Sequence, residues 1–347
     1  MKKHILIGLI IFLSLLGGCK KASIRFENII KLEETKVENF DLVTRGARLL
    51  IVDTFLVVQK MEEKFFQIYS TNSHKMLTEF GLDGRGFGEF RGPNLMKQTG
   101  FDNNNSSPVV YCYDFKRKKI SSINVLDAIK EGKVQEQTTV PGDYQLPYLY
   151  YLDSQLLVGA AEGNGRLVIH HLDEDREIFV PYVPDLGYAI PPNEIDIIYT
   201  SNSTLVNKKE KLIASAPLFL GQLDFFDFNG NYLRSTIFDD NDKYRSELEA
   251  GSDKFRETKY QITSMEAKDD LIFAFNLNSP SKEYTDGTIS GKVQVFDWTG
   301  NLKNEYLLGD RSIVSFAMDF KKNRIYTFSI SENTNSLSYY EFPEITK

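Results

Sequence analysis

The sequence predicts an all-β protein built as a six-bladed β-propeller, and three observations lead to this prediction. From residue 24 onward, short runs rich in Val, Ile, Phe, Tyr and Leu are each closed by Asp, Asn, Gly, Ser or Lys, as in strands and turns. Helical periodicity is confined to residues 244–259 and, briefly, to 127–131, too little for the crossover helices of a parallel sheet. One strand-turn-strand unit recurs six times along the chain.

The N-terminus carries the features of a secretory signal peptide. Two lysines precede an apolar run of about twelve residues that ends in two glycines and Cys19. A helix that crosses a bilayer needs about 20 residues, so this run is too short to span one. The tetrad Leu16–Cys19 resembles the bacterial lipobox. That resemblance implies a lipoprotein signal peptide over residues 1–18 and a lipidated tether over residues 19–23. Cleavage without acylation would leave Cys19 as a free thiol in an oxidising compartment.

Charge and cysteine content exclude several classes of protein. The net charge is −7, and it becomes −9 when residues 1–18 and their two lysines are removed, which argues against a nucleic-acid groove. No acidic run follows Cys19 of the kind that marks surface export in some lipoproteins. We therefore expect anchorage in the cell envelope, at the outer membrane and facing the periplasm. Cys112 lies alone in an apolar run and is expected in the core.

The recurring unit is a strand, a tight polar turn that begins with Asp or a near equivalent, and a strongly apolar strand. Its copies are spaced about 54 residues apart, and propeller blades of four strands repeat every 40–50 residues or so. The excess lies in insertions at 239–259 and 279–290. The copies are Val52–Val58, Phe101–Tyr111, Leu152–Val158, Val206–Ile213, Ala267–Phe273 and Met318–Tyr326.

Each unit also predicts a third and a fourth strand, joined by a hairpin with Asn-Gly or Thr-Gly in the turn. The clearest cases are Leu223–Leu233 and Val293–Leu302. The sixth unit ends with its third strand at Ser338–Phe342. We expect Arg25–Leu32 to supply the missing strand by pairing with the C-terminal strand, which closes the ring and leaves no long edge. A pair of β-sandwich domains is the alternative, but no linker or change in composition near the middle supports a boundary.

The segment Phe80–Pro93, FGLDGRGFGEFRGP, is the most specific stretch of the chain. It resembles the inter-blade signature of NHL and TolB-like six-bladed propellers, in which a glycine-rich turn ends in Glu-Phe and Pro before the next blade. With the lipobox, it resembles the TolB-like propeller lipoproteins, a family without a defined activity, and this implies one propeller domain over residues 24–347. The glycines do not form a nucleotide cradle, because such a loop opens a helix, whereas Phe90 and Pro93 lead into a strand.

Signatures of enzymes are missing from the sequence. It contains no Gly-x-Ser-x-Gly elbow, no His-Glu-x-x-His helix and no Cys pair. His170 and His171 are neighbours on a strand and point to opposite faces, so they cannot chelate one ion together. Two oxygen-rich clusters, 102–105 and 239–242, could offer ligands to Ca²⁺, but neither has the spacing of a calcium loop. We expect no cofactor, with Ca²⁺ the one ion worth testing.

The expected function is that of a binding module for an envelope protein or a small ligand, and not a catalyst. Two alternatives stay open: a metal-dependent hydrolase or lyase with scattered ligands in the central channel, and a structural envelope component with a plugged channel. The charged insertion 240–259 is a candidate partner-binding segment, expected as a short helix or a loop.

Inter-blade links and the loops between second and third strands surround one mouth of a propeller, where Tyr and Arg often anchor ligands. For the tyrosines the alternative is packing at the rim. For Glu89 and Arg91 it is a turn-stabilising ion pair. The candidate rim residues are Arg85, Glu89, Arg91, Tyr144, Tyr148, Tyr182 and Tyr188.

Overall fold

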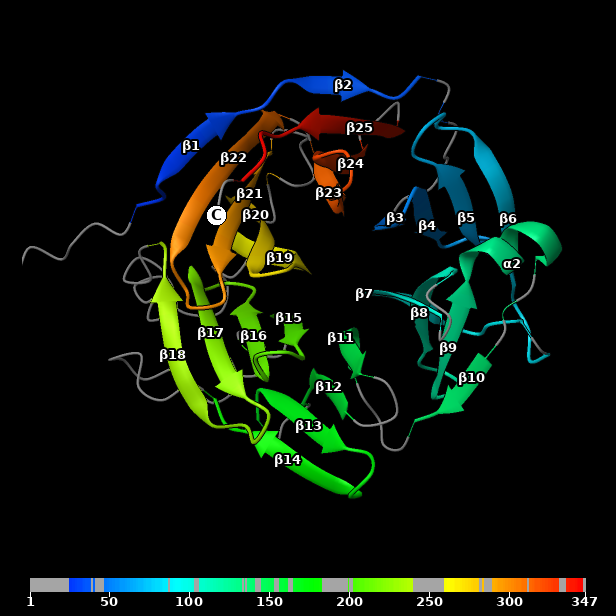
Figure 1. Ribbon diagram of the computed structural model, residues 1–347, viewed down its shortest axis with the longest axis horizontal. Coiled ribbons are helices and arrows are strands. Elements are labelled where there is room, and N and C mark those ends of the chain that lie inside the picture. The colour runs from blue at the N-terminus through cyan, green and yellow to red at the C-terminus, as the bar shows by residue number, and fades with distance from the viewer. Residues whose placement is uncertain are drawn as a thin grey trace, which may run out of the picture.

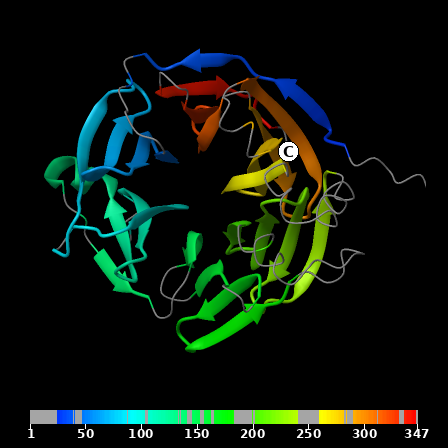
Figure 2. The same cartoon turned by 180° about the vertical axis from the view of Figure 1, so that it is seen from behind.

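The computed structural model shows six sheets arranged as blades around one axis (Figure 1; Figure 2 shows the ring from behind). It describes residues 25–38, 40, 47–86, 88–102, 106–132, 134, 136–140, 145–152, 156–161, 165–182, 199, 202–239, 259–280, 283, 289–310, 312–330 and 335–345. The predicted all-β six-bladed propeller is confirmed.

The blades follow one another in chain order, and each runs from an inner to an outer strand. Blades 1 and 2 consist of β3 (Ala47–Val52), β4 (Phe55–Lys60), β5 (Lys64–Ser70) and β6 (Met76–Leu82), then β7 (Pro93–Phe101), β8 (Pro108–Asp114), β9 (Lys119–Asn124) and β10 (Glu136–Thr139). Blades 3 and 4 consist of β11 (Gln145–Leu152), β12 (Leu156–Ala160), β13 (Leu167–His171) and β14 (Arg176–Val180), then β15 (Asn202–Asn207), β16 (Leu212–Pro217), β17 (Gln222–Asp227) and β18 (Tyr232–Ile237). Blades 5 and 6 consist of β19 (Lys259–Lys268), β20 (Leu271–Pro280), β21 (Ser290–Asp297) and β22 (Leu302–Asp310), then β23 (Ile313–Asp319), β24 (Arg324–Ile330) and β25 (Asn335–Glu341). Among the described residues, six strands, one from each sheet, lie nearest the centre of the ring: β3, β7, β11, β15, β19 and β23.

All six copies of the recurring unit fall at the turn between the first and second strands of a blade. In four of these turns, Asp53, Lys211, Asp269 and Asn323 have φ of 55°, 53°, 51° and 52°. Asp and Asn enter this left-handed region more readily than other residues with a side chain. The left-handed backbone therefore favours Asp or Asn at three of these four positions, whereas blade 4 carries Lys211 there.

The hairpins between third and fourth strands have an equally local cause. Asp297 accepts hydrogen bonds at Oδ1 from the backbone N–H groups of Thr299 and Asn301, both at 2.9 Å. Gly300 follows with φ of 92°. Asp227 makes the same bonds at the matching turn of blade 4. Side-chain capping together with a glycine that accepts positive φ stabilises the hairpin.

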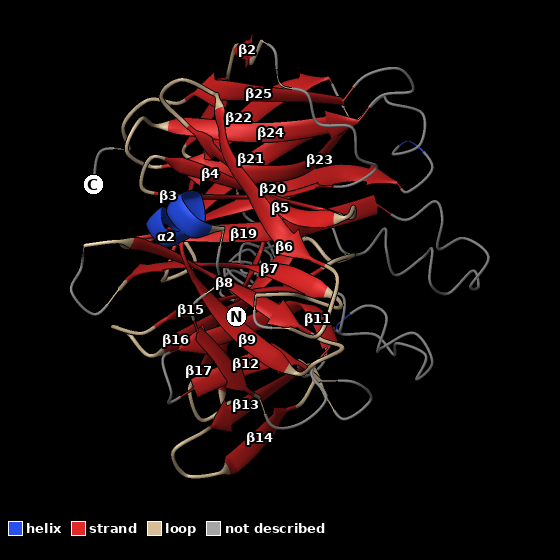
Figure 3. Ribbon diagram, turned by 90° about the vertical axis from the view of Figure 1, so that its right-hand side faces the viewer, coloured by secondary structure: helices blue, strands red, loops and turns tan. Residues whose placement is uncertain are grey.

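Successive antiparallel strands end alternately on the two faces of the ring. We call the face with the turns between first and second strands the turn face, and the face with the inter-blade links the link face. The short helix α2 (Val125–Glu131), expected at residues 127–131, joins the third and fourth strands of blade 2 and projects from the turn face (Figure 3). Asn124 Oδ1 caps it by accepting from the backbone N–H groups of Leu126 and Asp127.

An N-terminal strand closes the ring on the C-terminal blade, as predicted, but it is not the expected segment. The strand β2 (Glu34–Lys36) pairs antiparallel with β25, with Thr35 opposite Tyr339. The strand β1 (Asn28–Lys31), which lies within the segment predicted to close the ring, instead pairs parallel with β22 of blade 5. Ile30 packs against the core shared by blades 5 and 6. The more apolar segment was chosen from the sequence, whereas an outer closing strand is exposed and can be polar.

The core lies between neighbouring blades. Val57 and Phe66 of blade 1, for example, pack with Val110 and Ile123 of blade 2 in one buried cluster. Cys112 belongs to that cluster, fully buried as expected, and burial raises the pKa of its thiol. Helices of the described residues are all too short or too polar to cross a bilayer.

Buried polar side chains tie the blades together. The Gln59 amide of blade 1 donates to the Pro93 carbonyl at 2.7 Å and accepts from the Leu95 N–H at 2.6 Å in blade 2. Arg166 of blade 3 is fully buried, pairs with Asp224 and donates to the Ser215 carbonyl of blade 4 at 2.8 Å. These hydrogen bonds and this ion pair cross the junctions between neighbouring blades and so fix how the blades meet.

At the centre of the ring, Lys97 and Glu266 form what we call the channel ion pair. The Lys97 ammonium donates to Glu266 Oε1 at 2.6 Å and to the carbonyls of Leu49 at 2.7 Å and Phe316 at 2.5 Å. These partners come from the inner strands of blades 5, 1 and 6, whereas Lys97 comes from blade 2. Glu266 Oε2 accepts from the Met318 N–H at 3.0 Å. Burial lowers the pKa of Lys97 and raises that of Glu266, and their mutual attraction opposes both shifts.

Candidate anion-binding site

A cavity of about 400 Å³ lies on the link face at the junction of blades 1 and 2. The link between β6 and β7 forms one side of it, and the turn between β8 and β9 forms the other. Every described residue that lines it is basic, in a chain whose net charge is −7. We call it the cationic pocket. Its residues are Arg85, Arg91, Lys116, Arg117 and Lys119.

The glycine-rich link folds around the carboxylate of Glu89. Glu89 Oε2 accepts a hydrogen bond from the Gly86 N–H at 2.6 Å. A Cβ atom added to Gly84 would lie 2.0 Å from the same oxygen, and one on Gly86 would lie 2.9 Å from it. The glycines therefore leave the space that the carboxylate needs, and the signature builds a turn that presents Arg85 outward.

A buried carboxylate joins the two sides of the pocket. Asp114, at the end of β8, is only 1% exposed. Its Oδ2 accepts from the Arg91 N–H at 2.8 Å, and its Oδ1 accepts from the Arg117 N–H at 3.2 Å. Arg117 Nη1 then reaches back to the Glu89 carbonyl at 2.5 Å. Asp114 thus positions the backbone of both cation-bearing segments.

Arg91 and Lys116 each make a weak interaction near the cavity. Arg91 Nε lies 3.7 Å from Asp83 Oδ1, and both side chains are exposed, so this pair stabilises little. Lys116 Nζ lies over the Phe115 ring, 5.8 Å from its centroid. Two like charges about 4 Å apart repel by roughly 1 kcal/mol in water. A multiply charged anion would turn this repulsion into attraction.

The rim residues predicted from the sequence have different positions in the structure. Arg85 and Arg91 line the cationic pocket together. Glu89 stabilises the turn through Gly86 and makes no ion pair with Arg91. Tyr182 packs its ring against Tyr199, with centroids 5.4 Å apart, beyond blade 3. These positions do not test whether any of the residues binds a ligand. Cys19, Tyr144, Tyr188 and the side chain of Tyr148 lie outside the described residues, as do residues 240–258 of the charged insertion.

Three basic residues of the pocket were missed in the sequence. They lie in the run Lys116-Arg117-Lys118-Lys119, between two apolar strands. Four consecutive basic residues in a tight turn on the link face are a signal that could have found them.

The structure does not test the two oxygen-rich clusters as Ca²⁺ ligands. In the part of the chain that the structure describes, no three His, Cys, Asp or Glu side chains gather closely enough to hold an ion. Asp102 Oδ1 accepts from the Ser106 N–H at 2.9 Å and so shapes its own loop. Residues 103–105 and 240–242 of the two oxygen-rich clusters lie outside the described residues.

The comparisons with known proteins support the fold. No protein-family model and no curated protein matches the chain. Three solved structures are similar over most of their length, each at 11% identity. A member of the DUF4221 family from Bacteroides vulgatus has a TM-score of 0.54, with 90% of this chain and 98% of that chain covered. A Bacteroides fragilis protein named as a candidate exported protein has a TM-score of 0.52, with the same coverage. A luciferin-regenerating enzyme has a TM-score of 0.50, with 89% and 94% covered. At this identity the likeness concerns the fold alone.

Proposed function

We propose that this protein is a lipid-anchored envelope propeller, of the TolB-like or NHL type, that binds an anionic ligand or partner through its cationic pocket. The observation that carries the proposal is the convergence of five basic side chains from two separate segments on one cavity. A site of this composition suits phosphate or carboxylate groups, which Arg binds in bidentate fashion.

The channel ion pair favours binding over chemistry in the channel. The three hydrogens of the Lys97 ammonium already have acceptors in three other blades. None is left to activate or hold a substrate at that level of the channel. The link face, which carries the cationic pocket, is then the more suitable surface for a ligand.

The course of the N-terminal segment supports an orientation at the membrane. Glu27 lines a cavity together with Asp269 and Asp270 from the first turn of blade 5, so the chain enters the ring on the turn face. Only seven residues separate Cys19 from Glu27. A lipid at Cys19 would hold the turn face towards the membrane and leave the cationic pocket facing away. Export agrees with the name of the Bacteroides fragilis protein and with the signal peptide predicted here.

Titration calorimetry with pyrophosphate tests the ligand class. The sample is the mature chain, residues 19–347, with Cys19→Ser. The variant Arg85→Ala/Lys116→Ala should bind about tenfold more weakly at low salt, since each lost charge contributes up to about 1 kcal/mol. The control Lys209→Ala/Lys211→Ala removes the same charge from the turn face of blade 4 and should leave the affinity unchanged. Equal weakening in both variants would mean that only the net charge matters.

Metabolic labelling with palmitate tests the anchor. The wild-type chain should take up label and partition with membranes, whereas Cys19→Ser should remain unlabelled. The acyl chains on Cys19 would supply the membrane affinity, and even a single chain binds only marginally. Loss of all acylation should therefore release the protein from membranes. An unlabelled wild-type chain would contradict the lipoprotein assignment and leave the pocket untouched.

A further inference from the structure

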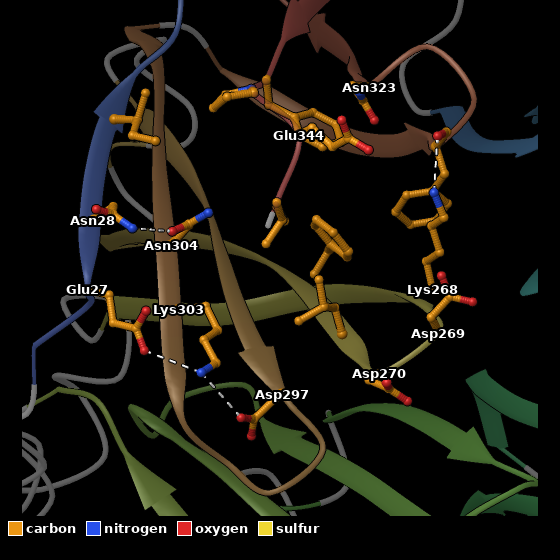
Figure 4. Close-up of a pocket in the computed structure, with 17 residues that line it drawn as sticks. Glu27, Asn28, Lys268, Asp269, Asp270, Asp297, Lys303, Asn304, Asn323 and Glu344 are labelled. Atoms are coloured by element: carbon orange, nitrogen blue, oxygen red, sulfur yellow. Dashed lines mark hydrogen bonds and ion pairs between the residues drawn. The ribbon is translucent and has the colours of Figure 1, made fainter. Parts of the chain in front are cut away.

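A second cavity, of about 780 Å³, lies on the turn face between blades 5 and 6 and is independent of the proposed anion site. The first turns of both blades, the strand β1 and the segment after β25 form its walls. Figure 4 shows labelled polar side chains around a group of apolar ones. The volume falls within the range of small-molecule sites, about 300–1,000 Å³. We call it the acidic cavity.

Aromatic rings form the floor of the acidic cavity. The Phe273 ring lies 5.1 Å from that of Phe320 and 6.1 Å from that of Phe342, measured between centroids. Phe273 and Phe342 are buried, whereas Phe320 is only partly covered. Leu271 and Ile345 beside them are also only partly buried. The floor therefore offers an apolar body the same surface that the core offers its own side chains.

The rim of the cavity is negatively charged. Among the described residues, five carboxylates and two ammonium groups line it, a net charge of −3. Lys303 is held between Glu27 at 3.3 Å and Asp297 at 3.7 Å (Figure 4). Both cations are thus already engaged, because Lys268 Nζ donates to the Phe320 carbonyl at 3.3 Å.

Three further carboxylates, those of Asp269, Asp270 and Glu344, are exposed on the same rim. Among the described residues, nothing pairs with them. A cation entering the cavity would meet these carboxylates without displacing an existing partner.

The protein itself places a cation against the aromatic floor of the acidic cavity. Lys268 Nζ lies 5.5 Å from the centroid of the Phe320 ring, within the range of cation–π attraction. An ammonium group on a ligand can use the same combination of ring face and carboxylate. The Lys268 ammonium would compete with it.

We propose that the acidic cavity binds a small organic cation, an ammonium group carried on an apolar or aromatic body. The body lies on the phenylalanine floor, and the ammonium faces Asp269, Asp270 and Glu344. The charge on the rim selects against anions of the same shape, which the cationic pocket on the opposite face would accept.

The probe for this proposal is phenethylammonium, compared with neutral phenethyl alcohol and anionic phenylpropanoate, each titrated into the mature Cys19→Ser chain by saturation-transfer NMR. Phenethylammonium should saturate at millimolar concentration and bind at least about fivefold more tightly than the alcohol. Equal affinity of the amine and the alcohol overturns the proposal, and so does failure of the amine to saturate.

Paired variants place the probe in the cavity. Asp269→Asn/Asp270→Asn should weaken phenethylammonium about fivefold, whereas Asp173→Asn, an exposed acid in a turn of blade 3 on the same face, should not. Lys268→Met removes the competing ammonium and should tighten binding about threefold.

Thermal unfolding serves as the control: each variant should unfold at the same temperature as the wild type, which shows that it is folded. Unchanged affinity in the double variant refutes the site. A peptide containing Lys-Phe-Lys that binds far more tightly than the amine would assign the cavity to a protein partner instead.

Discussion

The channel ion pair and the cationic pocket hold the same kind of charge in opposite circumstances. Lys97 is surrounded by acceptors from three other blades, and its ammonium group links the inner strands of these blades at the centre of the ring. Arg85 and Lys116 lie at an open surface among other cations, where Lys116 Nζ makes a cation–π contact with the exposed Phe115 ring. The contrast separates cations that belong to the fold from cations available to a ligand. Substitutions should therefore affect stability at the first place and binding at the second.

The largest expected effect is at Lys97. Lys97→Met leaves Glu266 buried without its counterion, and breaking a buried ion pair in this way costs about 3–5 kcal/mol. Denaturant unfolding of the mature Cys19→Ser chain measures the loss. The double variant Lys97→Met/Glu266→Leu should recover part of it, because no charge is then left unpaired. In contrast, Arg85→Ala/Lys116→Ala should stay within about 0.5 kcal/mol of the parent. A stable Lys97→Met protein would show that the pair does not hold the blades together.

Substitution of Asp114 should affect both stability and ligand binding. Asp114→Ala removes an acceptor shared by the backbone N–H groups of Arg91 and Arg117. Hydrogen bonds to a charged group contribute about 1.5–3 kcal/mol, so unfolding should become easier by that amount. Pyrophosphate affinity should fall as well, because the link and the turn lose their common support. Loss of stability with full retention of affinity would mean that Asp114 does not position the pocket.

The smallest effect is expected at His74, an intermediate case at the junction of blades 1 and 6. Its Nε2 lies 2.9 Å from the Tyr326 hydroxyl. Burial, and then the charges of Arg324 and Lys322, lower the pKa of His74 below 6.5. As the pH falls through 6.5, the unfolded chain takes up this proton first, so stability decreases until the folded imidazole also titrates. His74→Gln should flatten this decrease in denaturant unfolding on either side of pH 6.5. An unaltered slope would assign it to other groups.

Local causes made the blades predictable from the sequence, whereas long-range ones hid parts of the site. The turns at Asp53 and Asp269 and the hairpin at Asp297 depend on residues within a few positions, and all were found. The link with Arg85 and Arg91 was found through its glycines. Lys116 and Arg117 belong to a local run of basic residues, but they were missed because only the folded chain places their turn beside that link.

The channel ion pair was invisible for a related reason. A register shift between Leu95 and Thr99 interrupts β7 around Lys97, and its partner Glu266 lies 169 residues away. Nothing in a local pattern of apolar and polar residues reports such a pairing. The closing strand was misplaced because three polar residues, Glu34–Lys36, carry no apolar signal of their own.

The seam of the ring also sets an order of events during biosynthesis. The strands β1 and β2 leave the ribosome first, yet their partners, β22 and β25, are among the last strands made. The pair Asn28 and Asn304, 276 positions apart, is joined side chain to side chain at 2.9 Å. Residues 28–36 must therefore wait unpaired while nearly the whole chain is synthesised, and a chain that stops short of β25 cannot lock its ring. If Cys19 ties the protein to a membrane, any pull on the tether reaches this seam before it reaches the other blades.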